Sequence, residues 1–341
     1  MTLAEAREAA RAKFKGVCRV CRVCDGAACR GEVPGFGGVG SGQSFINNVE
    51  ALARIKVNLR TMHGCSQPDT SFSLFGRTLK FPILGAPVGG VKINRMGDVT
   101  ERELAGAMLE GPVLAGTIGM GGDGGNPEVY DAVLEAIGRL KGFGIAVVKP
   151  REKEEVIRKI RMAEEVGAFA VGMDVDAAAF INMALVGQKV EPKPVEELAE
   201  LVRCTRLPFI VKGVMTADEA EGAVEAGAAG IVVSNHGGRV LDHTPGTAEV
   251  LPEIAERVKG KTVIFVDGGI RSGVDVLKAL ALGADAVLVG RPLTIAAVGG
   301  GVEAVKLQVE ALGRELFQAM ILTGCATLKE IGPRVIRVHN G

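Results

Sequence analysis

The sequence predicts an α/β fold, a single (β/α)8 TIM barrel with an N-terminal Cys/Gly-rich helical extension. Three observations predict it: eight short apolar runs, helical patterns after most of them, and a length of 341 residues. A bare barrel needs roughly 250 residues, so one barrel plus an extension accounts for the chain. An open doubly wound sheet is the alternative, and the count of eight runs favours the closed barrel.

The apolar runs are rich in Val, Ile and Leu, and most end in Gly, Asp, Lys or Ser. Continuous apolar strands separated by helices are typical of a parallel sheet that is buried on both faces. Helical patterns occupy 152–166, 217–226, 246–258 and 273–282, among others. The predicted strands are 81–86, 112–115, 144–148, 168–174, 208–212, 229–234, 262–267 and 285–290.

The segments outside the strands divide the chain into two predicted parts. Residues 1–80 form the extension, with a helix at 3–14, a Cys- and Gly-rich stretch, and a helix at 43–53. Residues 81–341 form the barrel, with a closing helix at 302–323. No linker separates the parts, so we expect the extension to pack on the barrel.

Composition excludes several classes of partner. The formal net charge is zero and no basic stripe occurs, which argues against nucleic acid and anionic membranes. The sequence contains no stretch of ~18 apolar residues, so it predicts no transmembrane helix, and the N-terminus lacks an apolar signal segment. Seven cysteines, an odd number, in a chain without an export signal indicate a reducing cytoplasm, where cysteines serve as thiols or metal ligands rather than in disulfides.

Chemically rich residues follow the later strands, where barrels carry their active sites. Strand five ends in Lys212 and strand six in Ser-Asn-His-Gly-Gly-Arg (234–239). Strand seven ends in Asp-Gly-Gly-Ile-Arg (267–271) and strand eight in Gly-Arg (290–291). A lone His, Lys or Gly pair is usually structural, but their joint occurrence at the ends of several strands predicts a site.

These residue types suit a flavin and an acid substrate. Glycine pairs let main-chain N–H groups approach a phosphate, and Arg291, with Arg271 as a second candidate, would add charge. No Walker-type lysine motif is present, so ATP is not favoured, and a flavin monophosphate fits the remaining features. Lys212 would stabilise the negative charge of a reduced flavin ring.

The substrate side of the predicted site needs a base and a carboxylate clamp. His236 is a base suited to a hydroxyl proton near neutral pH, and Arg239 matches a flat carboxylate. Asp174 and Asp176 alternate along strand four, so either could orient His236 and stabilise its cation.

The segments 209–214, 234–242 and 266–292 together resemble the FMN-dependent 2-hydroxy-acid dehydrogenases and oxidases, such as glycolate and lactate oxidases. The pairing of Asn-His-Gly-Gly-Arg with Asp-Gly-Gly-Ile-Arg carries the resemblance. It is strong over roughly 205–330 and weaker over 80–180. It implies oxidation of a small 2-hydroxy acid to the 2-keto acid, with hydride transfer to flavin N5.

The resemblance also implies roles for single residues. His236 would be the catalytic base, Asp176 its partner, Arg239 the carboxylate clamp, and Lys212 a flavin contact. The residues expected to contact FMN are Ala86, Pro87, Lys212, Ser234, Asp267, Gly268, Gly269, Arg271, Gly290 and Arg291.

The sequence departs from the family pattern in the substrate shell. Residues 1–80 contain no Tyr, although the family usually has a substrate tyrosine there. The third strand runs into Lys149 where a second tyrosine is usual, and no second carboxylate-binding Arg follows Asp176. We therefore expect the redox core to be retained and the substrate contacts to be remodelled.

Cys18, Cys21, Cys24 and Cys29 form a C-x2-C-x2-C-x4-C cluster. Thiolates at this spacing could bind zinc or an iron–sulfur cluster, although the run matches neither common ferredoxins nor a paired zinc ribbon. Free thiols in a flexible loop are the alternative, and one active-site thiol is a third. The tyrosines that usually cover the barrel mouth are absent here. We expect the stretch 18–42, fixed by metal, to cover the mouth in their place.

Two other functions compete with 2-hydroxy-acid oxidation. A flavin-dependent isopentenyl diphosphate isomerase would use the same barrel, but a base with a carboxylate clamp argues against it. A non-enzymatic metal or redox sensor would not need His236, Lys212 and Arg239 together. We expect a homo-oligomer, and the sequence names neither the acid nor the electron acceptor.

Overall fold

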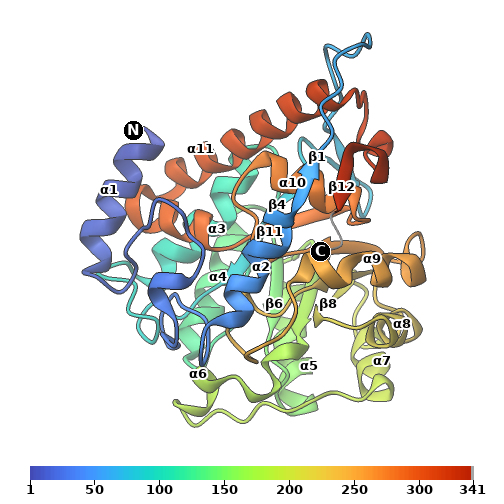
Figure 1. Cartoon of the computed structure of the whole chain (residues 1–341). Helices are drawn as coiled ribbons and strands as arrows, with labels where there is room; N and C mark the ends of the chain where they lie inside the picture. Colours follow the sequence, from blue (N-terminus) through green and yellow to red (C-terminus); the bar gives the residue numbers. More distant parts are fainter. Residues whose placement is uncertain (339–341) are drawn as a thin grey trace.

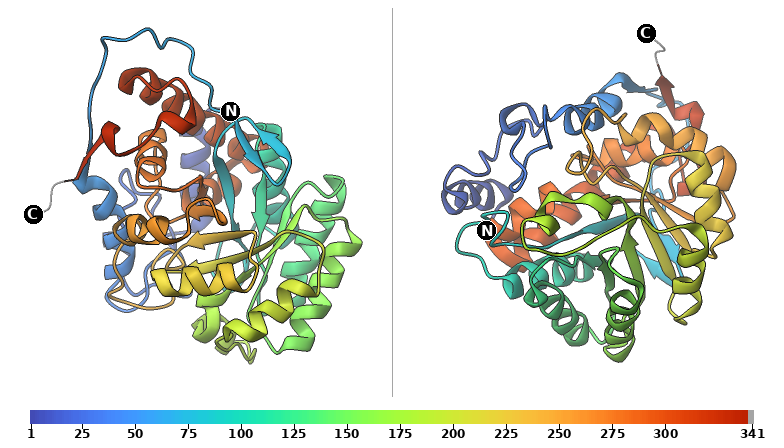
Figure 2. Two further views of the ribbon diagram at one scale, coloured as in Figure 1. Left: turned by 90° about the vertical axis from the view of Figure 1, so that its right-hand side faces the viewer. Right: turned by 90° about the horizontal axis from the view of Figure 1, so that it is seen from below.

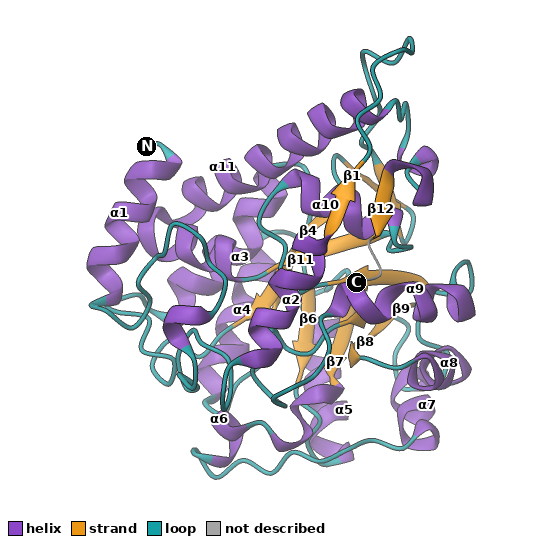
Figure 3. Cartoon of the chain, in the orientation of Figure 1, coloured by secondary structure: helices purple, strands orange, loops and turns teal. Residues whose placement is uncertain are grey.

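A computed structural model describes residues 1–338 as a closed barrel of eight parallel strands surrounded by helices (Figures 1 and 3). Neighbouring strands follow the chain order, and β11 closes the barrel against β4. This confirms the predicted fold. The barrel strands are β4 (Ile83–Val88), β5 (Gly119–Gly121), β6 (Ile145–Val148), β7 (Ala170–Asp174), β8 (Phe209–Val214), β9 (Gly230–Val233), β10 (Val263–Val266) and β11 (Ala286–Val289).

The helices between the strands match the predicted ones within one or two residues wherever a helix was assigned. A short helix, α6 (Ile181–Ala184), lies in the loop after β7. The helices that surround the barrel are α3 (Glu101–Leu114), α4 (Pro127–Arg139), α5 (Lys153–Glu165), α7 (Val195–Arg203), α8 (Ala217–Glu225), α9 (Thr247–Val258), α10 (Gly273–Ala281) and α11 (Arg291–Thr323).

The barrel interior is a packed core rather than a pore. Inward side chains such as Leu84, Met120 and Phe265 form one buried cluster. The hairpin of β2 (Phe72–Leu74) and β3 (Arg77–Leu79) adds Leu74 and Leu79 to the same cluster. Branched and aromatic residues thus fill the barrel, as its geometry requires.

The predicted second strand, 112–115, is wrong. Pro112 to Leu114 form the last turn of α3, and the strand is β5, Gly119–Gly121. The helix lies so close to the strand that a Cβ on Gly119 would be 2.3 Å from the Met108 carbonyl oxygen. Glycine is needed for this approach, and its low strand propensity hid the strand from the apolar pattern.

The closing helix is longer than predicted and is broken. Helix α11 begins at Arg291, directly after β11, and non-helical dihedral angles at Gly300 and Gly301 divide it. The predicted helix 302–323 is its second half. The first half carries Arg291 and Thr294 at the barrel mouth.

The N-terminal residues pack on the flank of the barrel. Helix α1 (Leu3–Phe14) begins with a capping box between Thr2 and Glu5, and it packs against α11 (Figure 2). Helix α2 (Gln43–Arg54) packs against α9, and β1 (Ile55–Val57) pairs with β12 (Ile336–Val338). Across residues 1–338, none of the helices has the length and apolar character needed to cross a membrane.

Candidate active site

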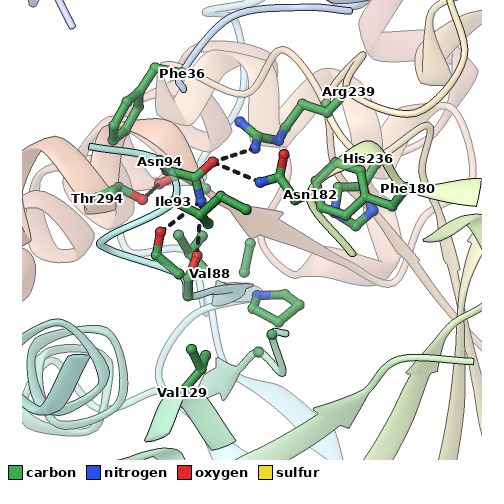
Figure 4. A pocket seen from close by; sticks show the side chains of 18 of the residues that line it. Phe36, Val88, Ile93, Asn94, Val129, Phe180, Asn182, His236, Arg239 and Thr294 are labelled. Carbon is green, nitrogen blue, oxygen red and sulfur yellow. Dashed lines mark hydrogen bonds between the residues drawn. The ribbon is translucent and has the colours of Figure 1, made fainter. Parts of the chain in front are cut away.

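A cavity of about 580 Å³ opens among the loops that follow the barrel strands. Its volume is that of a typical cofactor pocket. Figure 4 shows part of its wall. Most residues predicted to act or to contact the cofactor line it: Ala86, Pro87, Lys212, His236, Arg239, Asp267, Gly268, Gly269, Arg271, Gly290 and Arg291.

Ser234 does not line this cavity. The residue is fully buried at the end of β9, and its Oγ accepts a hydrogen bond from the main-chain N–H of His236 at 3.1 Å. Ser234 holds the turn that carries His236. Its predicted contact with the cofactor stays a prediction.

His236 and Asp176 form the predicted pair. Nδ1 of His236 lies 3.0 Å from Oδ1 of Asp176, and the imidazole packs on the Phe180 ring with 4.9 Å between centroids (Figure 4). Burial lowers the pKa of His236; the cations of Lys212 and Lys149 lower it further, against the opposing effect of Asp176. His236 is thus neutral at pH 7, the state a proton acceptor needs.

A glycine makes room for this pair. Gly213 in β8 has φ +106°, and a Cβ there would lie 2.5 Å from Cγ of Asp176. Only glycine adopts this backbone conformation without strain and leaves the space that the carboxylate occupies. Asp176 lies in the short 3-10 turn after β7, not in the strand as the alternation argument assumed.

The second aspartate, Asp174, pairs with lysines and not with His236. Its Oδ2 lies 2.6 Å from Nζ of Lys149, and its Oδ1 lies 3.0 Å from Nζ of Lys212. Burial opposes the charge on Lys212, but the carboxylates of Asp174, Asp176 and Asp267 outweigh it and raise its pKa. Lys212 is therefore a fixed cation in the cavity wall.

Arg239 is held by neighbours that sequence analysis did not identify. Its guanidinium donates to the carbonyl of Gly35 and, at 2.9 Å, to Oδ1 of Asn94. The same Oδ1 accepts from Nδ2 of Asn182 at 3.0 Å (Figure 4). Burial, and then the charge of Arg291, lower the pKa of Arg239 to about 9, so the group stays cationic at neutral pH.

Asn182 carries an unused acceptor. The residue is 5% exposed and lines the cavity, and its Oδ1 has no hydrogen-bond partner. The sequence shows that no Arg follows Asp176 in this stretch, but it does not indicate a role for Asn182. Nothing in the sequence distinguishes Asn94, because an isolated Asn in a loop is common.

Arg271 and Arg291 join the cavity to the N-terminal segment. Arg291 donates to the carbonyls of Phe36, Gly37 and Gly237 at 2.8–3.1 Å, which uses three of its five N–H groups. Arg271 donates to the carbonyls of Cys24 and Ile270. Each guanidinium lines the cavity and keeps donors for an anion.

The cavity wall fits FMN in two respects. Gly268 and Gly269 both have positive φ and line the cavity directly after β10. Asp267 is buried and its Oδ1 has no hydrogen-bond partner, so an acceptor is available for a sugar-like hydroxyl. Main-chain glycines, arginine charge and this acceptor match the phosphate and ribityl parts of FMN.

The Gly-rich segment lies at the mouth, as predicted from the missing tyrosines. Gly35 and Phe36 line the cavity, and the N–H of Val39 donates to the carbonyl of Gly238 at 2.9 Å. A carboxylate, Asp242, accepts from the N–H of Ser41 and the N–H of Gln43. Gly35 and Phe36 thus form part of the cavity wall, and the contacts of residues 39–43 hold the segment against the loop after β9.

The four clustered cysteines line a smaller cavity of about 20 Å³ beside Arg291. All seven cysteines of the chain are free thiols. Burial raises the pKa of Cys18, and it raises that of Cys29 to about 11. Within residues 1–338, the only set of three or more His, Cys, Asp or Glu ligand atoms within 4.8 Å of one another is Asp174, Asp176 and His236.

Known proteins resemble the chain over most of its length. The family of FMN-dependent dehydrogenases matches residues 36–185 and 161–338. Human 2-hydroxyacid oxidase 1 is 32% identical over 88% of this chain and 90% of its own. L-lactate oxidase of Lactobacillus jensenii is 33% identical over 86% of this chain and 78% of its own. A crystal structure of mandelate oxidase superposes with a TM-score of 0.81 at 30% identity, covering 100% of this chain and 98% of the other.

Proposed function

We propose that this chain, which belongs to the family of FMN-dependent dehydrogenases, oxidises a small 2-hydroxy acid to the 2-keto acid at the cavity described above. One observation carries the proposal: His236, paired with Asp176 at 3.0 Å, shares the cavity wall with Arg239 and Lys212. The relatives named above are oxidases, so the isomerase alternative has no support from them.

The chain's own residues supply proton transfer and orientation. Arg239 binds the substrate carboxylate, because a guanidinium pairs with both oxygens of a flat anion. Neutral Nε2 of His236 then accepts the proton of the 2-hydroxyl group, and Asp176 at Nδ1 stabilises the imidazolium that forms. FMN, when bound, supplies N5 as the acceptor of the hydride from C2.

Lys212 and the glycine-rich strand ends would hold the cofactor. The fixed cation of Lys212 suits the negative charge that a reduced flavin carries. Gly268, Gly269, Arg271 and Arg291 would surround the phosphate, with Asp267 at the ribityl hydroxyls. Ala86 and Pro87 would contact the ring from the end of β4.

The substrate shell favours an acid with a second polar group. The unpartnered Oδ1 of Asn182 is an acceptor, so we propose a hydrogen-bond donor, such as a hydroxyl group, on the substituent of the acid. A methyl group would leave this buried acceptor unsatisfied, which typically costs about 1–3 kcal/mol.

We also propose a cytoplasmic, homo-oligomeric protein with an extension at 1–80 and a barrel at 81–341. Free thiols at all seven cysteines suit a reducing compartment. Two Arabidopsis relatives are named as peroxisomal, and microscopy of the tagged protein in cells tests the cytoplasmic location. Light scattering of the purified protein tests the oligomer.

Replacing the base tests the proposed function. His236→Ala should slow flavin reduction by a panel of 2-hydroxy acids about 10²–10⁴-fold, because no group remains to accept the hydroxyl proton. Anaerobic stopped-flow absorbance of the flavin measures the rate, and released FMN measures cofactor content. The exposed His243→Ala is the matched control. Reduction of His236→Ala at the control rate would remove the residue from the mechanism.

A further inference from the structure

The active site leaves one group of reactive side chains unexplained. Cys18, Cys21, Cys24 and Cys29 lie in the loop between α1 and α2, where the only regular element is a single 3-10 turn at Ala27–Cys29. Loops of this length without secondary structure are uncommon in folded domains and are usually functional. None of the four thiols takes part in the proposed reaction.

The fold gathers the four thiols around one space. All four cysteines line the 20 Å³ cavity, and the other walls include Phe36, Phe45 and Ile295. Two cations face the same place: Arg291 lines the cavity, and Nη2 of Arg271 lies 3.7 Å from Sγ of Cys24. Asp25 and Arg19 also line this cavity.

The loop backbone is held from outside. Arg7 donates to the carbonyls of Val20 and Cys21, and Arg11 donates to the carbonyls of Arg19 and Val20. Arg271 donates to the carbonyl of Cys24 from the barrel side. These contacts hold the loop backbone at residues 19–21 and at Cys24, so the stretch that carries the first three cysteines is tied to α1 and to the barrel.

The spacing of the sulfurs distinguishes between metal groups. Four thiolates on one zinc ion, each about 2.3 Å from the metal, lie about 3.8 Å apart. Within residues 1–338, no three of these sulfurs lie within 4.8 Å of one another, although they share a cavity. A polynuclear iron–sulfur cluster places several atoms between its ligands and takes four cysteine thiolates.

We propose that Cys18, Cys21, Cys24 and Cys29 bind an iron–sulfur cluster, which fixes residues 18–42 over the active-site cavity. The negative charge of four thiolates would be balanced by Arg271 and Arg291. Cluster binding supplies free energy that orders the loop, as metals do in small metal-dependent domains. The inference does not depend on the identity of the acid substrate.

The test uses the full-length FMN-containing protein, purified without oxygen or reconstituted with ferrous iron and sulfide. Iron and acid-labile sulfide should be present in equal amounts, and Mössbauer spectroscopy should show iron bound by sulfur, free of overlap with the flavin spectrum. Zinc in place of iron, or protein that retains neither iron nor sulfide after reconstitution, would overturn the proposal.

Serine variants locate the cluster. Cys21→Ser and Cys24→Ser should lower the iron content about tenfold or more. Cys65 and Cys204 lie outside the cluster, so the control variants Cys65→Ser and Cys204→Ser should keep the iron content of the unaltered protein. Circular dichroism checks folding, and the unaltered protein decides the question if a variant fails to fold. Equal iron loss in the control variants would exclude the four cysteines as ligands.

Trypsin provides a readout of loop order. Arg22 is exposed between two of the cysteines, so cleavage after it reports an opened loop. Cluster-loaded protein should resist this cut, and the Cys21→Ser variant should be cut readily. Equal cleavage of both would show that no cluster orders the segment.

Discussion

Single residues decide the protonation state of His236, the proposed base. Burial and two lysines lower the pKa of His236, while Asp176 opposes them. Asp174 cannot substitute for Asp176, because its two oxygens are paired with Lys149 and Lys212. The sequence predicted either aspartate as the partner of His236, and only the contacts in the folded structure show that the partner is Asp176.

The first prediction concerns Asp176→Asn. Removing the carboxylate removes the effect that raises the pKa of His236, so the acid limb of kcat/KM should move to lower pH. The reaction should also slow about 10²–10⁴-fold, because the imidazolium loses its partner. Flavin reduction measured across pH 4 to 8 checks both effects, with the exposed Asp218→Asn as control. An acid limb that stays in place would contradict the pairing.

Asn182 carries the prediction on substrate choice. Wild-type protein should prefer a 2,3-dihydroxy acid to its 3-deoxy analogue, and Asn182→Ala should reduce that preference about fivefold to tenfold. The ratio of kcat/KM for the two acids is the measurement, and the deoxy acid serves as the internal control. An unchanged ratio would show that Asn182 does not contact the substituent.

At the scale of elements, glycines set how closely helices approach. A Cβ on Gly273, at the start of α10, would lie 2.2 Å from the main-chain nitrogen of Leu316 in α11. Backbone atoms cannot move aside as a flexible side chain can. The contact between α10 and α11 therefore depends on this glycine.

We predict that Gly273→Ala lowers the free energy of unfolding by about 1–3 kcal/mol, because the added methyl group forces the two helices apart. Gly138→Ala is the matched control, since Gly138 lies in α4 and a Cβ added there would meet no heavy atom within 4 Å. Alanine there should be neutral or stabilise by about 0.5–1 kcal/mol. Guanidinium unfolding of both variants gives the comparison; equal effects would refute the packing argument.

At the scale of the whole molecule, Arg291 links three parts of the chain. It stands at the start of α11, donates to the segment 36–37 and to Gly237, and lies 3.7 Å from the Phe45 ring centroid in α2. The proposed phosphate contact and closure of the mouth therefore depend on the same side chain.

The prediction for the whole molecule is that FMN at a hundredfold excess over its Kd stabilises the folded protein by about 2.7 kcal/mol. Arg291→Ala should weaken FMN binding about tenfold to a hundredfold, and so reduce the gain at the same FMN concentration. Thermal unfolding with and without FMN measures this gain in stability. The exposed Arg314→Ala should behave like wild type, and an Arg291→Ala variant with the full gain would exclude the phosphate role.

Much of the architecture was determined by local sequence. Continuous apolar runs predicted seven of the eight barrel strands, and the helix predicted at 3–14 has the bounds of α1. The strand ends at Lys212, 234–239, 267–271 and 290–291 converge on one cavity because parallel strands end at the same face. These features depend on periodicity and topology, which a sequence records directly.

Other features depend on contacts between segments far apart in the chain. Strand β5 forms from glycines that α3 and α4 approach closely, which no local preference indicates. The partner of His236, the unused acceptor of Asn182, and the contacts of Arg271 and Arg291 with residues 24–37 likewise arise only after folding. The sequence by itself determined the barrel and most of the chemistry at its mouth; the tertiary structure alone decided which side chains meet, because burial and distance are properties of the packed chain.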